Sequence, residues 1–277
     1  MADERSCDQP VLPLMRVLLG VGTVLVFAAG TQLYVFSADT GRYFAWTIAN
    51  PLTAATIGAF YYGAVVIAGL STRERRWDLA RVGVPGIAAF LWLTIAASVA
   101  HLTVLHLHTH GLAPRTAAIA WLVIYIADPP LFLLAYVLQL RAGGRDSAMP
   151  APAPAWHRWA CAVLAVPVLA VGVWLFALPG PGARHWAWFL PPIAAQALAA
   201  WLIALALLLG SVAKEGDLLR SRPATAGMVA FAVLQAAALA RYPHTAHGAA
   251  AIAWIVLLGT VGVLGGYALA RLPAALK

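Results

Sequence analysis

The chain has 277 residues, of which 62% are hydrophobic and only 10% are charged. Soluble globular proteins are about 45–50% apolar and about 25% charged, so this composition excludes a water-soluble globular domain. The formal net charge of +8 does not indicate nucleic-acid binding, because the sequence has neither a long basic run nor a known nucleic-acid-binding motif.

The first ten residues, MADERSCDQP, are polar and lack the basic segment and the cleavage site of a signal peptide, so the first apolar run is expected to remain as a helix. Runs long enough to cross a hydrocarbon core of about 30 Å follow along the chain. Their predicted ranges are 14–36, 51–70, 82–105, 115–140, 158–178, 191–212, 223–240 and 248–270. The predicted fold class is an all-α integral membrane bundle of about eight transmembrane helices in a lipid bilayer.

Basic residues are unevenly distributed between the segments that connect these runs. Fourteen of the 18 Lys and Arg residues lie in the N-terminal segment, the links 71–81, 141–158 and 213–222, and the C-terminus. The four others are Arg42, Arg115, Arg184 and Arg241. The positive-inside rule therefore predicts cytoplasmic termini in a bacterial inner or plasma membrane.

Several short motifs of the first half recur in the same order in the second half. RYFAWTIANP at 42–51 is similar to ARHWAWFLPP at 183–192, and AIAW at 118–121 recurs at 251–254. The further matches are Arg73, Glu74 and Arg81 with Lys214, Glu215 and Arg222, and His110-Gly111 with His247-Gly248. A unit of four spans begins and ends on one side, so we predict two parallel four-helix repeats, 1–140 with the N-terminal tail and 158–277, joined by a cytoplasmic linker at 141–157.

The segment FAWTIANPLTAATIGAFYYGA, residues 44–64, resembles a segment of bacterial multi-pass membrane proteins that have no assigned activity. The pattern that carries the resemblance is FAWTI-x-x-PLTAA. The resemblance implies a membrane location and implies no particular chemistry.

Histidine is concentrated on the predicted outer side. Seven of the eight histidines lie there, and only His157 lies on the inner side. The seven are His101, His106, His108, His110, His185, His244 and His247. If the third span continues as a helix through HLTVLHLHTHG, the first and third histidines of this cluster share one face and the second and fourth share another.

Neutral imidazole is a good ligand for zinc, copper, nickel and haem iron, so this pattern predicts an outer site for a transition metal or haem. The candidate ligands are His101, His106, His108, His110, His244 and His247. The alternatives are proton handling by solvated histidines and interfacial histidines without a specific role.

Asp128 lies fourteen residues past Pro114, which is about 20 Å along a helix and near the middle of a bilayer. An ionisable group at that depth is costly and is a functional candidate by default. The following Pro129 and Pro130 remove two backbone donors and free carbonyls that could line a cavity. The alternative is a protonated structural aspartate that caps a broken helix.

Three further features have both a functional and a structural interpretation. Arg241 could pair with an anionic substrate group, a lipid phosphate or a haem propionate, or it extends to the membrane interface. Trp46, Trp186 and Trp188 are typical of an aromatic belt at the interface, with a quinone or haem pocket as the alternative. The inner link STRERRWDLAR is predicted to be a solvated loop.

The sequence leaves enzyme activity undecided, because it contains no nucleotide-binding P-loop, nucleophile elbow, HExxH or CxxCH motif. Its two cysteines, Cys7 and Cys161, offer no disulfide framework. Three hypotheses follow: a histidine-lined extracytoplasmic site for metal, haem, redox or proton chemistry; a small-solute or ion transporter that uses Asp128; and a non-catalytic accessory subunit of a membrane complex. The sequence identifies no protein partner.

Overall fold

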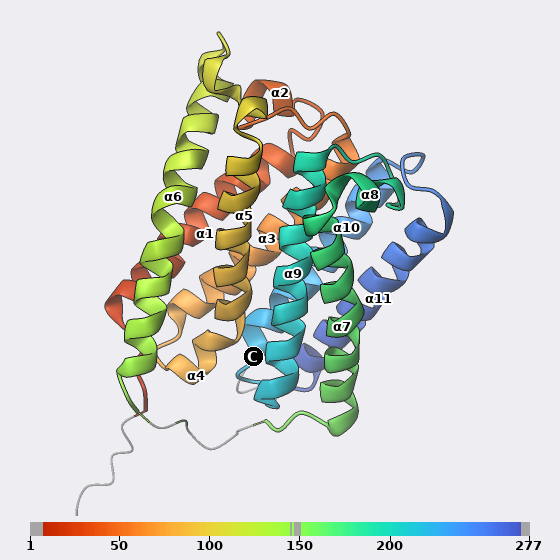
Figure 1. Ribbon diagram of the computed structural model, residues 1–277. Coiled ribbons are helices and arrows are strands. Elements are labelled where there is room, and N and C mark those ends of the chain that lie inside the picture. The colour runs from red at the N-terminus through yellow and green to blue at the C-terminus, as the bar shows by residue number, and fades with distance from the viewer. Residues whose placement is uncertain (1–7, 145, 147–150, 273–277) are drawn as a thin grey trace, which may run out of the picture.

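The computed structural model describes residues 8–144, 146 and 151–272, so Cys7 lies outside the described residues. Within them, eight helices are long and apolar enough to cross a membrane, and they fit a multi-pass membrane protein (Figure 1). They are α1 (Pro13–Tyr34), α3 (Pro51–Arg73), the span Trp77–Ala100 that ends with α5 (Val84–Ala100), α6 (Leu112–Arg141), α7 (Ala155–Ala177), α9 (Pro192–Glu215), α10 (Arg222–Arg241) and α11 (Gly248–Ala270). The predicted all-helical bundle is confirmed.

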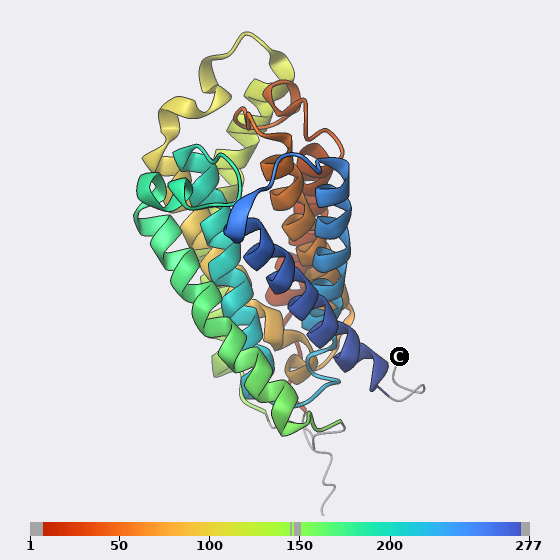
Figure 2. The same ribbon diagram turned by 90° about the vertical axis from the view of Figure 1, so that its right-hand side faces the viewer.

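Short elements gather at the two ends of this bundle (Figures 1 and 2). One end, here called the histidine end, carries α2 (Thr40–Tyr43), the 3₁₀ turns η2 (Leu102–Val104) and η3 (His106–His108), and α8 (Pro179–Arg184). The opposite end, here called the basic end, carries α4 (Trp77–Ala80), the 3₁₀ turn η1 (Arg81–Gly83) and the described residues nearest to both termini.

Proline and glycine set several helix boundaries. Pro13, Pro51 and Pro192 lie in the first turn of their helices, where the missing backbone N–H would have had no helical partner. The side chain of Asn50 accepts a hydrogen bond from the backbone N–H of Leu52 and caps α3. These local signals explain why the predicted span boundaries are close to the observed ones.

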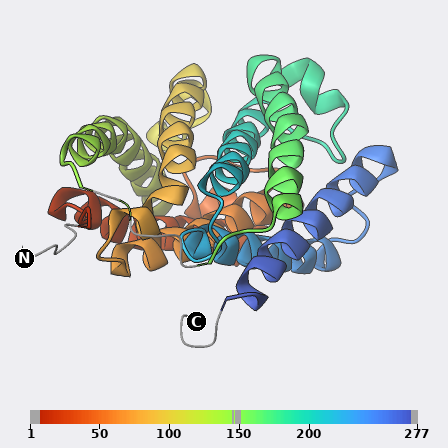
Figure 3. The ribbon, with the colours of Figure 1, turned by 90° about the horizontal axis from the view of Figure 1, so that it is seen from below.

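The two central helices of the bundle are α3 and α9 (Figure 3). Their most apolar segments are 67% and 72% buried, whereas those of α1, α6, α7 and α11 are only 17–33% buried. Helix α1 packs on α3 and α7 packs on α9, while α10 packs on both α3 and α11, and α5 packs on both α9 and α6. The central helix of each half therefore contacts a helix of the other half.

Two close contacts between the halves are related by the 141-residue offset, because Gly86 corresponds to Gly227 and Gly63 corresponds to Ala204. A Cβ atom at Gly86 would lie 2.8 Å from the backbone oxygen of Ala204, and a Cβ atom at Gly227 would lie 2.8 Å from the backbone oxygen of Gly63. Real Cβ atoms do not approach oxygen so closely, so both crossings depend on glycine.

The aromatic rings between these crossings recur in the same way. Phe90 stacks on Trp201 and Phe60 stacks on Phe231, each with 3.9 Å between the ring centroids, and Phe60 also stacks on Trp201 at 5.5 Å. These paired contacts agree with the two parallel repeats that the sequence motifs predict, and the repeats stay a prediction.

Candidate functional site

The described residues of the histidine end are not grouped as a metal site. Helix α5 ends at Ala100, because His101 leaves helical backbone geometry, and two separate 3₁₀ turns follow. The shared helix faces predicted for the histidine cluster therefore do not form. In the described part of the chain, no three His, Cys, Asp or Glu side chains are placed so that they could hold a metal ion.

Hydrogen bonds already engage two of the candidate ligands. Nε2 of His101 lies 2.9 Å from Oε1 of Gln196. In His106, Nδ1 lies 3.0 Å from the backbone oxygen of Phe44 and Nε2 lies 3.0 Å from the hydroxyl of Thr47. A neutral imidazole that donates from Nδ1 and accepts at Nε2 satisfies both contacts, so His106 keeps no free lone pair for a metal.

The other candidate histidines, His108, His110, His244 and His247, are exposed. His185 is exposed as well, and its Nδ1 lies 3.1 Å from the backbone oxygen of Pro181. His157 is buried at the basic end with Nε2 3.1 Å from the backbone oxygen of Leu264. The histidines are thus dispersed among separate local environments.

Arg241, Trp46 and Trp188 make contacts with other residues of the protein. The guanidinium of Arg241 donates to the backbone oxygen of Tyr34 at 3.0 Å, at the end of α1, and lies over the ring of Tyr242. Trp46 and Trp188 are only 2% and 4% exposed, so they do not form the exposed belt that the sequence suggests. They pack on the AIAW tryptophans, Trp46 on Trp121 at 5.0 Å and Trp188 on Trp254 at 6.1 Å.

The structure places Asp128 beside a cavity of about 150 Å³ between α1, α3, α5, α6, α9 and α10. Asp128 lies thirteen residues before the end of α6 at Arg141, about 20 Å along the helix, so its predicted mid-membrane depth agrees with its position in the observed span. Helix α6 is continuous through Pro129 and Pro130. There is consequently no broken helix for Asp128 to cap.

The walls of this cavity are aromatic and nearly free of charge. Of the described residues that line it, Asp128 alone carries a formal charge. Its carboxylate has no hydrogen-bond or ion-pair partner among the described residues, and its side chain is partly exposed. The aromatic lining residues are Phe60, Tyr61, Phe90, Trp121, Tyr125, Phe132, Trp201 and Phe231.

Two buried tyrosines face each other in the same cavity. The hydroxyls of Tyr61 on α3 and Tyr125 on α6 are 2.8 Å apart, and the side chains are only 1% and 5% exposed. Pro129 has no N–H, so the backbone oxygen of Tyr125, four residues earlier, lacks its helical donor. Asp128 and the two phenols are the oxygen-bearing side chains among the described residues that line the cavity.

Contacts on both sides of Asp128 hold α6 against the rest of the bundle. Towards the basic end, the buried side chain of Gln139 accepts from the backbone N–H of Leu12 at 2.8 Å and donates to the backbone oxygen of Pro10 at 2.9 Å, joining α6 to the start of α1. Towards the histidine end, Trp121 packs edge-to-face on Phe44 and Trp46.

The second half contains a cavity of about 410 Å³ between α7 and α11. The AIAW motif aligns Tyr125 with Leu258 and Asp128 with Val261, and the 141-residue offset aligns Tyr61 with Leu202. The described residues that line this cavity include no acidic side chain. The combination of Tyr61, Tyr125 and Asp128 is thus specific to the first half.

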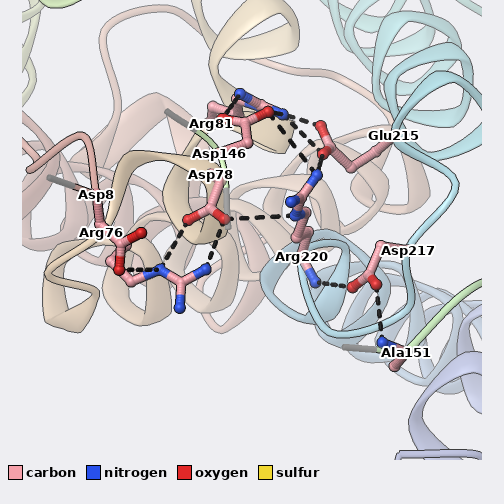
Figure 4. A network of polar contacts seen from close by, with 9 residues as sticks. All are labelled: Asp8, Arg76, Asp78, Arg81, Asp146, Ala151, Glu215, Asp217 and Arg220. Carbon is pink, nitrogen blue, oxygen red and sulfur yellow. Dashed lines mark hydrogen bonds and ion pairs between the residues drawn. The ribbon is translucent and has the colours of Figure 1, made fainter. Parts of the chain in front are cut away.

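The inner link, predicted as a solvated loop, is instead part of a buried ion-pair network (Figure 4). Asp78, only 4% exposed, accepts two hydrogen bonds from Arg76, at 3.1 and 2.6 Å, and lies 3.4 Å from the guanidinium of Arg220. Hydropathy could not reveal this burial, because Asp78 also contacts Arg220, which comes from a distant segment.

The same network joins the two halves at the basic end. Arg81 and Arg220 both bind the Glu215 carboxylate, at 2.8 and 2.9 Å. The 141-residue offset relates Arg81 to Arg222 and Glu215 to Glu74. Arg222 and Glu74 also form an ion pair, at 3.3 Å. The pairs Arg81 with Glu215 and Arg222 with Glu74 each link one half to the other, so these charges hold the basic end together.

None of the protein-family models, curated proteins or solved structures compared with this chain matches it. The likeness of residues 44–64 to bacterial membrane proteins without an assigned activity therefore stays a prediction. The functional argument depends on the geometry of the site.

Proposed function

We propose that this protein carries a small solute across the bilayer and that the cavity at Asp128 is its substrate site. The supporting observation is a carboxylate at mid-membrane depth that lines a cavity without a hydrogen-bond or ion-pair partner among the described residues. Placing an ionisable group in such surroundings is costly, and a structural role would require a partner that offsets this cost. A bound solute can supply that partner.

The position of the cavity inside the bundle, between six of the helices, agrees with a carrier mechanism. The solute would be held in this cavity, and the protein would expose it to one side of the membrane at a time. Following the distribution of basic residues, we place the basic end in the cytoplasm of a bacterial cell and the histidine end outside.

The other two hypotheses have less support. The histidine-site hypothesis requires several imidazoles around one ion, whereas His101 and His106 are engaged within the protein and four further candidates are exposed. An accessory-subunit role would require an interface with a partner, and the exposed apolar side chains equally suit contact with lipid.

Uptake by reconstituted vesicles tests the transport proposal. Vesicles containing the protein would be offered three small solutes that cross membranes slowly, namely tetramethylammonium, methanesulfonate and glycine betaine, which differ in net charge. We expect at least one to enter faster than into protein-free vesicles, and Asp128→Asn to abolish this uptake. Thr260→Val, which alters the lining of the second cavity, is the matched control and should retain uptake.

Two results would contradict the proposal. One is the absence of uptake of all three solutes above the protein-free rate. The other is uptake that Asp128→Asn leaves unchanged, because passage would then not involve this carboxylate.

A further inference from the structure

We infer that the ligand of the Asp128 cavity is a small organic monocation with an apolar surface, such as an alkylammonium ion. This inference rests on the proposed function, because it assumes that the cavity is the substrate site. It adds the chemical class of the solute, which transport by itself does not specify.

Charge complementarity is the first argument. Asp128 is the only formal charge among the described lining residues, and neither Lys, Arg nor His is among them. An anion would meet a carboxylate without any compensating cation. A monovalent cation balances the carboxylate.

The composition of the walls distinguishes an organic cation from a bare metal ion. Calcium and magnesium require roughly six to eight oxygen ligands, whereas the lining side chains offer one carboxylate and two phenol oxygens. Most of the lining is instead aromatic or aliphatic. Aromatic rings attract a cation electrostatically and apolar walls bury hydrocarbon surface, which together suit an ammonium ion with alkyl groups.

The size of the cavity limits the ligand. An engineered apolar cavity of about 150 Å³ in another protein binds benzene, and the cavity at Asp128 has about the same volume. Ions of the size of tetramethylammonium fit this limit, whereas larger multi-ring cations do not.

The second half supplies an internal comparison. It has a larger cavity with tryptophan in its lining, yet Leu202, Leu258 and Val261 occupy the positions aligned with Tyr61, Tyr125 and Asp128. Aromatic walls alone are therefore present in both halves. Only the first half combines them with a negative charge, which is the feature that selects a cation.

Equilibrium binding to the full-length protein in lipid nanodiscs tests this inference. The probes are tetramethylammonium and tert-butanol, which have nearly the same shape but differ in charge, and calorimetry measures both dissociation constants. We expect tetramethylammonium to bind about tenfold more tightly, or better, than tert-butanol. Asp128→Asn should remove this preference, and Asp128→Glu, which keeps the charge, should retain part of it.

A steric variant tests the location of the ligand without altering the charge. Gly22 lines the cavity, and a Cβ atom there would meet no other atom within 4 Å, so Gly22→Phe can be accommodated and should block tetramethylammonium binding. Gly259→Phe on α11 has equally open surroundings and is the matched control, which should bind normally. Circular dichroism and melting temperature would verify that each variant is folded.

The outcomes separate this inference from the transport proposal. Equal affinity of the wild type for both probes, or a cation preference that survives Asp128→Asn, would overturn the inference even if vesicles take up another solute. Unchanged tetramethylammonium binding by Gly22→Phe would place the ligand elsewhere and overturn it as well. A cation preference that depends on Asp128, combined with no uptake into vesicles, would contradict transport and leave the ligand class supported.

Discussion

At the scale of single residues, three side chains distinguish the two cavities of this protein. Tyr61, Tyr125 and Asp128 line the first cavity, and the aligned positions in the second half are apolar. The tyrosine hydroxyls are buried and bonded to each other, so each satisfies the other. Their mutual dependence leads to a prediction about stability.

Removing one hydroxyl of this pair should lower the free energy of unfolding by more, per hydroxyl removed, than removing both. Tyr61→Phe leaves the hydroxyl of Tyr125 buried without its partner, and we expect a loss of about 1 kcal/mol in the free energy of unfolding. Tyr125→Phe should behave in the same way. The double variant removes both polar groups, so its loss should be smaller than the sum of the single losses.

Unfolding in mixed micelles with increasing sodium dodecyl sulfate measures these three variants against the wild type. Strict additivity of the two single effects would show that the hydroxyls do not depend on each other, and would contradict the hydrogen bond seen in the structure.

At the scale of helices, the two glycine crossings determine how the halves approach. Helix α5 meets α9 at Gly86, and α10 meets α3 at Gly227, in both cases with backbone oxygen directly opposite the missing Cβ. Backbone cannot give way as a flexible side chain does. The aromatic stacks of Phe90 on Trp201 and of Phe60 on Phe231 lie on the same pairs of helices.

We predict that Gly86→Ala and Gly227→Ala each destabilise the protein by about 1–3 kcal/mol, because the added methyl group forces the helices apart. Gly259→Ala is the control, since its Cβ would meet no atom within 4 Å and alanine favours a helix. Thermal unfolding followed by circular dichroism compares the three. A wild-type melting temperature for Gly86→Ala and Gly227→Ala would show that the crossings tolerate a wider spacing.

At the scale of the whole molecule, the contacts between the halves are continuous from one end to the other. The helix pairs α3 with α10 and α5 with α9 form the centre, and the pairs Arg81 with Glu215 and Arg222 with Glu74 close the basic end. Each half alone would expose these surfaces and leave buried charges without partners.

We therefore predict that residues 1–148 and 149–277, co-expressed as two separate chains, assemble into a stable complex. A tag on the first chain should co-purify the second in equal amounts, and neither chain should accumulate when it is expressed alone. An unrelated tagged four-span membrane protein serves as the control for non-specific association. Failure of the two halves to co-purify would contradict the proposal that they are separate repeats held together by this interface.

The sequence by itself determined the spans of this protein and the depth of Asp128. A run of about 20 apolar residues has to be helical in lipid, because lipid offers the backbone no hydrogen bonds, and proline and asparagine mark where such helices begin. The depth of Asp128 followed from the helical rise of 1.5 Å per residue. Both inferences depend on local chemistry alone.

The tertiary structure alone decided what surrounds these residues. Hydropathy cannot distinguish a lipid-facing side chain from a buried one, so neither the cavity nor the central position of α3 and α9 could be read from it. Tyr61 bonds to Tyr125, Asp78 contacts Arg220 and Glu215 binds Arg81, and each of these partners lies far away in the sequence. The helix considered for the histidine cluster does not form for the same reason. The chain folds over the bundle after Ala100, where the backbone N–H of His106 donates to Ala45, and spacing along the sequence contains no record of that contact.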